Sequence, residues 1–359
     1  MSVSTWPGSG EAWVDMKVLD ALKMPFWVAQ VATGAKSFRD NPVLGSRRLN
    51  ERGLHVARVR AAEAMADRRR RGMEDLLDDH HRRFFAENGY VEQRNVLPAD
   101  TFAQLLEEVY GTRFDAWEMR QGNAVTRFIP LPPEVLRRLP ALAAFVNGAV
   151  FQGTLKYVAS TRAEPTVYLH AVLTDPDLGT PDPQTHFHAD TFFANSKAWF
   201  FLDDVPEADG PFRFVPGSHR LTPERAAWEQ TQSETAATHG NRLHGRGSFR
   251  ISEDDLATLG FAPPVTFEVP ANTLVVADTF GFHARTPSLR PSVRIAIYGS
   301  VRRNPFLPFA GLDPLTLPGL RGRSAQLLNA YRDTRARLLK KPQSERYIGK
   351  TLLTDPAHL

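Results

Sequence analysis

Along the first quarter of the chain, apolar residues fall loosely at helical spacing and charged residues fill the gaps between them. The clearest run begins at Leu54 and ends near Gly72, where a glycine after a basic stretch is typical of a helix end. Two more helices are expected, one from Leu76 to Gly89 and one after Pro98. We therefore expect a helical N-terminal extension over residues 1–83.

The pattern changes near residue 150, where short apolar runs alternate with Pro, Gly and Asp. These runs are rich in Val, Phe, Ile and Tyr, which predicts strands, and their number and spacing favour a barrel or a sandwich. The expected strands, one of them earlier in the chain, are residues 90–97, 166–173, 198–202, 212–215, 274–277 and 293–299.

Two further segments have a different texture. Residues 222–262 are polar with little periodicity, so we expect an insertion or lid there rather than part of the core. After Pro318 apolar residues return to helical spacing, which predicts a C-terminal helical segment over residues 311–359.

Composition narrows the function classes. The 359 residues include no cysteine, which excludes disulfides, thiol catalysis and zinc–thiolate sites. The net charge of only +4 does not indicate nucleic acid as a partner. No apolar run approaches the roughly 18–20 residues of a transmembrane helix. Acidic residues precede the first apolar stretch, unlike in a signal peptide, so we expect a cytoplasmic protein.

Aromatic and basic residues are mixed near the N-terminus. The aromatic residues are Trp6, Trp13, Phe26 and Trp27, and the basic residues include Lys17, Lys23, Lys36 and Arg39. This mixture suits peripheral contact with an anionic lipid surface. A helical cap packed on the barrel is the alternative and the preferred interpretation.

Candidate metal ligands occur in two places. His188 and Asp190 are two residues apart, and on a β-strand such residues point to the same side. His283 follows a strand-like run that ends at Asp278. Two histidines and one carboxylate on one face of a metal form the facial triad of non-haem iron(II) oxygenases. A His-X-Asp pair alone is only weakly specific for a metal site. The prediction therefore depends on whether further expected residues follow it along the chain.

Arg294 lies on the next strand-like run after His283. The planar guanidinium suits a carboxylate, such as the distal one of a dicarboxylate cosubstrate. An arginine within an apolar strand is costly unless it is paired, so a buried partner is expected. The alternative is an edge strand with Arg294 in water.

This ordered set resembles the phytanoyl-CoA dioxygenase family of iron(II)- and 2-oxoglutarate-dependent oxygenases. The resemblance covers about residues 84–303, and the run Gly210-Pro-Phe-Arg-Phe-Val-Pro-Gly-Ser-His219 is its more specific part. The other residues that carry it are His188-Ala-Asp190, His283, Arg294, Phe85-Ala-Glu-Asn-Gly-Tyr90 and Asn95-Val-Leu-Pro98.

The resemblance implies an α+β fold with a mainly β core. A double-stranded β-helix, also called a jelly roll and cupin-like, would occupy residues 84–310, with the N-terminal and C-terminal helices packed around it. Iron(II) would bind His188, Asp190 and His283, with 2-oxoglutarate and O2 as cosubstrates. Arg294 would hold the C5 carboxylate of 2-oxoglutarate.

The chain departs from the family at one position. Family members often place a small hydroxyl residue two positions after the distal histidine, near the cosubstrate carboxylate. Arg285 stands there, and Thr286 follows it. Thr286 is therefore the expected second contact of 2-oxoglutarate.

Asp190 also bears on the reaction. Halogenating relatives carry Gly or Ala at this position, so a carboxylate favours hydroxylation of an unactivated C–H bond, with release of succinate and CO2. The substrate would be a small molecule, or an acyl or lipid compound. A non-catalytic jelly-roll binding protein and a jelly-roll enzyme with another divalent metal are the alternatives.

Several other polar residues have structural explanations as well. His186 is expected to point into the same pocket as His188 without binding the metal, and His219 is expected to belong to a Pro-Gly turn. In the insertion, a carboxylate or phosphate ligand and a solvated lid are equally good explanations for the basic residues Arg242, His244, Arg246 and Arg250.

Overall fold

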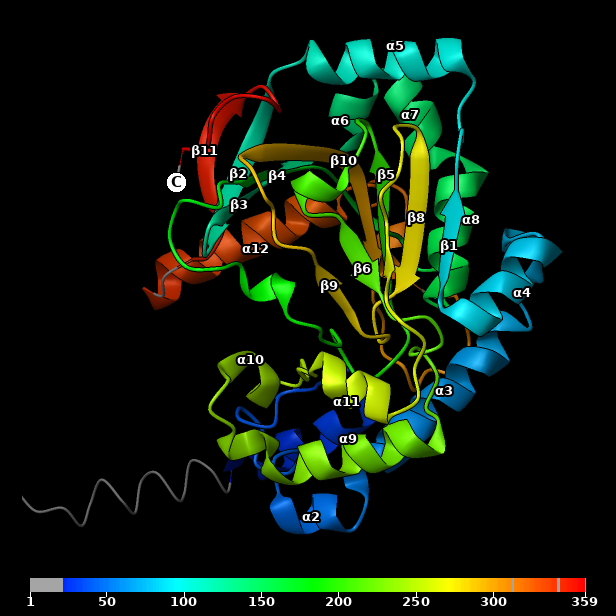
Figure 1. Ribbon diagram of the computed structural model, residues 1–359, viewed down its shortest axis with the longest axis vertical. Helices are drawn as coiled ribbons and strands as arrows, with labels where there is room; N and C mark the ends of the chain where they lie inside the picture. Colours follow the sequence, from blue (N-terminus) through cyan, green and yellow to red (C-terminus); the bar gives the residue numbers. More distant parts are fainter. Residues whose placement is uncertain (1–21, 312, 341–342, 359) are drawn as a thin grey trace, which may run out of the picture.

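The computed structural model describes residues 22–311, 313–340 and 343–358. Two antiparallel sheets face each other and form a double-stranded β-helix, as predicted (Figure 1). The larger sheet consists, in spatial order, of β1 (Tyr90–Gln93), β8 (Thr273–Asp278), β5 (Ser196–Phe201), β10 (Ser292–Val301), β4 (Thr166–Thr174), β3 (Ala124–Pro130), β2 (Phe114–Gln121) and β11 (Arg346–Thr351). The smaller sheet consists of β7 (Val265–Thr266), β6 (Phe212–Phe214) and β9 (His283–Arg285).

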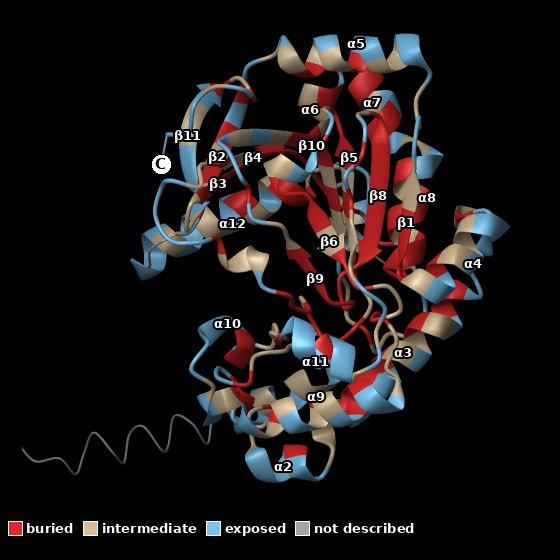
Figure 2. Ribbon diagram, in the orientation of Figure 1, coloured by how far each residue is buried: buried red, intermediate tan, exposed pale blue. Residues whose placement is uncertain are grey.

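Strand alternation gives the larger sheet two different faces. On β5, Phe200 packs into the main core, whereas Trp199 and Phe201 point to the space between the sheets. On β10, Ile295 packs into the core and Arg294 faces the same inner space. The main core therefore lies behind the sheet, where β8 is buried along its whole length (Figure 2).

Helices cover the outer face of the larger sheet and its ends. The Phe145 ring of α7 stacks on Phe200 with ring centroids 4.1 Å apart. These helices are α4 (Asp79–Asn88), α5 (Ala99–Tyr110), α6 (Pro133–Leu136), α7 (Pro140–Asn147), α8 (Ala149–Val158) and α12 (Ser324–Leu339). Short 3-10 turns are η1 (Gln30–Ala32), η2 (Glu74–Leu76), η3 (Pro183–Thr185), η4 (Glu207–Asp209), η5 (Ala236–Thr238) and η6 (Pro314–Thr316).

The expected insertion is helical rather than irregular. It forms α9 (Pro223–Thr235), α10 (Arg242–Gly245) and α11 (Glu253–Thr258), which lie beyond one end of the sheets together with α2 (Arg47–Glu51) (Figure 1). Helix α9 packs on α2 and on α3 (Leu54–Arg70). The helical period escaped prediction because the buried face of α9 is polar, with Arg225, Glu229 and Ser233 at intervals of four residues.

The C-terminal segment differs from the expectation as well. Helix α12 forms as predicted, but residues after it add β11 to the edge of the larger sheet, next to β2. The hairpin of β2 and β3 was not predicted either.

No helix within the described ranges is long and apolar enough to cross a membrane. Of the aromatic residues noted near the N-terminus, Trp6 and Trp13 lie outside the described residues. Phe26 is exposed.

Candidate metal centre

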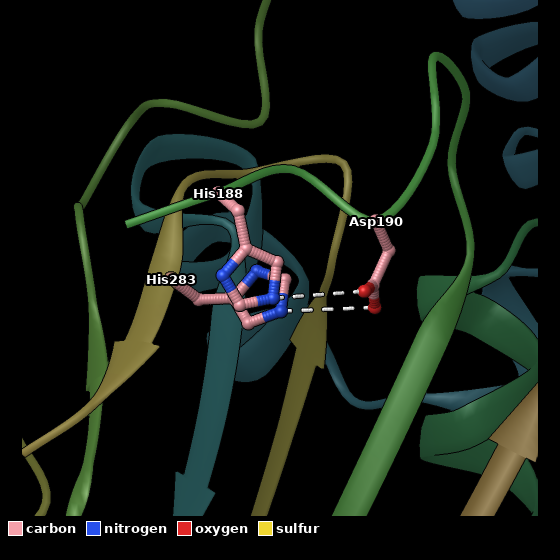
Figure 3. A group of neighbouring side chains, drawn as sticks. All are labelled: His188, Asp190 and His283. Atoms are coloured by element: carbon pink, nitrogen blue, oxygen red, sulfur yellow. Dashed lines mark ion pairs between the residues drawn. The ribbon is translucent and has the colours of Figure 1, made fainter. Parts of the chain in front are cut away.

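Three predicted ligands meet in the space between the two sheets. His188, Asp190 and His283 offer donor atoms that all lie within 4.8 Å of one another. The Nε2 atom of His188 is 3.8 Å from Oδ1 of Asp190, and Nε2 of His283 is 3.6 Å from Oδ2 (Figure 3). One small cation can bridge donors at this spacing, and two imidazoles with one carboxylate suit a mid-series divalent metal such as iron.

The backbone orients both imidazoles. Nδ1 of His188 lies 2.8 Å from the carbonyl oxygen of His186, and Nδ1 of His283 lies 2.9 Å from that of Gly281. Because a carbonyl only accepts, each Nδ1 carries the proton and donates it. Each Nε2 is then left with a lone pair directed toward the other ligands, as metal-binding histidines require.

The segment that carries the first two ligands is not the regular strand that the sequence predicted. His188 makes single antiparallel bridges to His283 and to Arg250, and Asp190 donates its backbone N–H to Thr279. Without a continuous strand, the side chain of His186 is exposed and does not line the cavity of His188. The expectation that it points into that pocket is wrong, and its contribution is its carbonyl group.

The electrostatics match what a metal requires. Burial lowers the pKa of both histidines, that of His283 to about 4, so both are neutral at physiological pH. Burial alone would raise the pKa of Asp190, but Lys197 and the histidines outweigh it and hold that pKa well below its usual value. Neutral imidazole and ionised carboxylate are the forms that bind metals.

A cavity of about 280 Å³ contains the three ligands together with Arg294. Strand β10 lies between β5 and β4, which excludes the edge-strand alternative for Arg294. No carboxylate of the described residues forms an ion pair with Arg294, and its buried Nε has no hydrogen-bond partner. Burial, with the nearby charge of Arg285, lowers the pKa of Arg294 to about 9. The expected protein partner is absent from these ranges, so Arg294 is an unsatisfied cation in the cavity of the triad.

Arg285 and Thr286 are arranged differently from Arg294. Arg285 lines the same cavity but is paired with Asp182, with Nη1 2.7 Å from Oδ2. The hydroxyl of Thr286 donates to the carbonyl of Pro211 at 2.7 Å. Thr286 lines a smaller cavity of about 50 Å³, which shares Arg285 and Arg294 with the first.

His219 is buried away from the triad. It lies against Gly89, where an added Cβ would be only 2.5 Å from Nδ1 of His219, and against the ring of Phe85. It is not among the residues that meet at the candidate metal site. The structural interpretation of the Pro-Gly turn therefore fits its position.

Sequence reasoning missed two cavity residues and one residue beside the triad. Nζ of Lys197 is 2.6 Å from Oδ2 of Asp190, and the ammonium group of Lys36 donates to the backbone carbonyl of Asp190. His170 lines the cavity between Phe128 and Tyr298. Lys197, Trp199 and Phe201 are two residues apart along one strand and therefore share a face. The inward direction of Lys197 could have been predicted from the sequence for this reason. Lys36 gave no such signal.

Comparisons with known proteins give one match to a protein family. Residues 85–259 match the model of the phytanoyl-CoA dioxygenase (PhyH) family, a range that includes His188 and Asp190 but ends before His283. None of the curated proteins matches the chain.

Several solved structures are similar. The carbocyclase SnoK from nogalamycin biosynthesis is 22% identical with a TM-score of 0.38, over 65% of this chain and 85% of SnoK. HygX from Streptomyces hygroscopicus, solved with nickel and 2-oxoglutarate, is 15% identical with a TM-score of 0.38, over 62% of this chain and 86% of HygX. EctD from S. alaskensis is 13% identical with a TM-score of 0.38, over 63% of this chain and 76% of EctD.

The family match covers the segment that supplies two of the three candidate ligands, and the fold brings the third to them. Through residues 85–259, the chain is similar to the phytanoyl-CoA dioxygenase (PhyH) family, in agreement with the resemblance seen in the sequence.

Proposed function

We propose that this protein is an iron(II)- and 2-oxoglutarate-dependent dioxygenase that hydroxylates a C–H bond of a small-molecule, acyl or lipid substrate. In this reaction, substrate, 2-oxoglutarate and O2 become hydroxylated product, succinate and CO2. The observation that carries the proposal is the unpaired guanidinium of Arg294 in the cavity that also holds His188, Asp190 and His283.

Arg294 discriminates between the proposed oxygenase and the alternatives. A cation without a counter-ion inside a folded protein is unfavourable unless a ligand supplies the missing charge. A binding module that only kept the fold has no use for such a residue beside three metal ligands. A hydrolase or isomerase with another divalent metal needs the ligands but no anchor for a distal carboxylate.

The residues then have distinct tasks. His188, Asp190 and His283 would hold iron, which together with 2-oxoglutarate supplies the activation of O2. Arg294 orients the cosubstrate by binding its C5 carboxylate through the planar guanidinium. Arg285 stands where the family often has a small hydroxyl residue and adds a second, already paired cation to this end of the cavity.

We also propose Thr286 as a second contact of 2-oxoglutarate, as expected from its place in the sequence. Its hydroxyl already donates to the carbonyl of Pro211. Because the oxygens of 2-oxoglutarate only accept hydrogen bonds, a contact with Thr286 would require its hydroxyl to turn from Pro211 to the cosubstrate, whereas the Nε of Arg294 is a donor without a partner. Arg294 is therefore the main anchor in this proposal.

The carboxylate of Asp190 favours hydroxylation over halogenation. It lies 3.6–3.8 Å from both imidazole nitrogens and therefore occupies the third ligand position of the triad. A halide would need that position. The aromatic side chains of Trp199, Phe201 and Phe212 line the same cavity.

The test is succinate release from 2-oxoglutarate by anaerobically iron-loaded protein after exposure to O2, beside an Asp190→Ala variant. Slow turnover without substrate is expected in the unchanged protein and should disappear in the variant. Binding is followed separately by the absorption band of the iron(II)–2-oxoglutarate complex. If the unchanged protein shows neither turnover nor the band, the cosubstrate assignment fails and the binding-module alternative is favoured.

A further inference from the structure

We propose that the substrate is a small anion, an inference that rests on the proposed function. Its carboxylate or phosphate group is held beside the metal by Lys36, Lys197, Arg250 and Arg302, four cations that surround Asp190. This cationic cluster is separate from Arg294 and has no counter-ions other than Asp190 among the described residues.

Two of the four cations contact Asp190 directly. Lys197 reaches its carboxylate from β5, with Nζ 2.6 Å from Oδ2, and Lys36 donates to its backbone carbonyl from the N-terminal segment. A carboxylate that binds a metal shares its negative charge with that metal. Lys197 then needs a second anion to balance its charge.

The segment before Lys36 is held by hydrogen bonds from α3. Arg58 of α3 is buried and donates to three carbonyl groups between Val31 and Ala35, at 2.7–2.9 Å. These bonds fix the segment that directs Lys36 toward Asp190. The position of Lys36 is therefore built into the fold rather than a chance contact of a surface lysine.

Arg250 and Arg302 approach from two other elements. Arg250 lies in the insertion between α10 and α11, where its backbone bridges to His188, and its guanidinium donates to Ser248 at 2.7–2.9 Å. Arg302 follows β10 and donates to the carbonyl of Gly34 at 3.2 Å. Neither guanidinium forms an ion pair with a carboxylate in the part of the chain that the structure describes.

The positive charge of the cluster is not balanced by its neighbours. Four cations face one carboxylate. Iron(II) and the dianion 2-oxoglutarate cancel each other's charge, so the excess of positive charge persists in the loaded enzyme.

The cationic cluster and Arg294 approach the cavity from different positions of the larger sheet. Lys197 is opposite Ser300 of β10, six positions along the strand from Arg294, and both side chains line the cavity of the triad. In the proposed function Arg294 holds 2-oxoglutarate, which leaves the cations beside Asp190 for a second anion. Lys36 and Arg302 also lie outside residues 85–259, so the family match does not account for them.

The location limits the size of the substrate. An anion held by groups that contact Asp190 lies next to the metal that Asp190 would bind. The oxidised carbon is therefore only a few bonds from the carboxylate or phosphate. Neutral lipids and hydrocarbons lack the group that this cluster recognises.

The experiment measures anion binding to the anaerobic iron(II)–2-oxoglutarate complex by calorimetry and by the change in its absorption band. The probes are acetate and methylphosphonate, with acetamide as the neutral control. Saturating 2-oxoglutarate occupies Arg294 first, so a second anion reports on the cationic cluster. Binding of acetate alone indicates a carboxylate substrate, and tighter binding of methylphosphonate indicates a phosphate ester.

The variants are Lys36→Gln and Arg250→Gln, with Arg137→Gln as the matched control because Arg137 is exposed on the surface and outside the cluster. Removing one charged donor should raise the Kd of the probe about tenfold or more. Arg137→Gln should leave the Kd unchanged, and Lys36→Arg should restore most of the binding. Formation of the iron(II)–2-oxoglutarate band in each variant shows that the rest of the site is intact.

The outcomes separate this inference from the proposed function. If the band forms but neither probe binds, or the Gln variants bind as tightly as the unchanged protein, the anionic substrate is refuted while the oxygenase stands. If the band does not form in the unchanged protein, the proposed function itself fails.

Discussion

His188 and His283 exchange two backbone hydrogen bonds, each 3.0 Å from nitrogen to oxygen. They thus form one hydrogen-bonded antiparallel pair, although they are far apart in the sequence. Their ring centroids are 4.4 Å apart. Because the backbone pairing fixes both residues, the separation of these two metal ligands does not depend on the metal.

Replacing His283 with Ala should therefore abolish metal binding without unfolding the protein. Metal affinity should fall at least about 100-fold, more than for a residue that only orients a ligand. The melting temperature of the metal-free variant should stay close to that of the unchanged protein, because the backbone pair survives. Calorimetric titration with iron(II) or nickel(II) and a thermal melt check both parts.

His186→Ala is the matched control. The side chain of His186 is exposed, and its contact with His188 is through the backbone carbonyl, which the substitution keeps. Metal affinity should be unchanged. A loss comparable to that of His283→Ala would show that the His186 side chain is itself a ligand.

Arg294→Leu should stabilise the protein while it destroys cosubstrate binding. The guanidinium forms no direct ion pair with a carboxylate of the described residues, and burial outweighs the charges of Asp182 and Asp209, so replacing it with an apolar side chain should raise the free energy of unfolding by about 1 kcal/mol. 2-Oxoglutarate with metal should raise the melting temperature of the unchanged protein but not that of the variant. Thermal melts with and without 2-oxoglutarate measure both effects.

Arg285→Leu should behave in the opposite way. Arg285 is paired with Asp182, so its loss leaves a buried carboxylate without its partner and should lower the stability. If both Leu variants were destabilised equally, the distinction between a paired and an unpaired arginine would be wrong.

The fold was predictable where the core is apolar. Strands such as β4 and β10 carry continuous apolar runs on their buried face, and the runs showed in the sequence. Helix α9 and strands β2 and β3 bury charged residues instead, among them Glu229, Glu118 and Arg127. Strand β11 is mostly exposed and has no apolar run. Patterns of hydrophobicity cannot reveal elements whose buried side chains are satisfied by partners elsewhere in the chain.

The residues of the site that belong to sequence motifs in a fixed order could be predicted. The resemblance to the family supplied His188, Asp190, His283 and Arg294 together, and the structure brings all four to one cavity. Lys36 was not predictable, because only the fold brings the N-terminal segment to Asp190. The cluster that we propose to select the substrate therefore depends on tertiary structure.

The stability contributed by Glu229 should depend on pH. Burial raises its pKa, but the hydrogen bond with His55, 2.7 Å long, and the charge of Arg225 outweigh burial and lower it. A carboxylate with a lowered pKa in the folded state stabilises the protein above its unfolded pKa of 4.5, and this contribution is lost as the pH falls through the folded value. Glu229→Gln should lower the free energy of unfolding at pH 7 by roughly 3–5 kcal/mol.

The measurement is urea unfolding of both proteins between pH 7 and acidic pH. The difference between them should shrink as the pH falls from the unfolded pKa of 4.5 through the lower folded pKa, because Glu229 is protonated first in the unfolded chain and only at lower pH in the folded protein. A difference that is constant over the whole range would mean that the charge of Glu229 contributes nothing to its hydrogen bond with His55 and its ion pair with Arg225.

Arg127 should be essential for the C-terminal part of the larger sheet. It is fully buried, it is bound to Glu118 at 2.7 Å, and it donates to four carbonyl groups between Leu352 and Pro356 at 2.8–2.9 Å. Arg127→Leu leaves Glu118 buried without this cation and removes the donors of the C-terminal segment, which should lower the free energy of unfolding by roughly 3–5 kcal/mol.

The loss should be local before it is global. Strand β11 pairs only with β2 in the described part of the sheet, so it has few other contacts to hold it once Arg127 is gone. Amide hydrogen exchange should therefore show residues 346–356 losing protection in Arg127→Leu, while β5, β8 and the pair of His188 and His283 stay protected. Uniform loss of protection would instead mean that the C-terminal segment and the metal centre unfold as one cooperative unit.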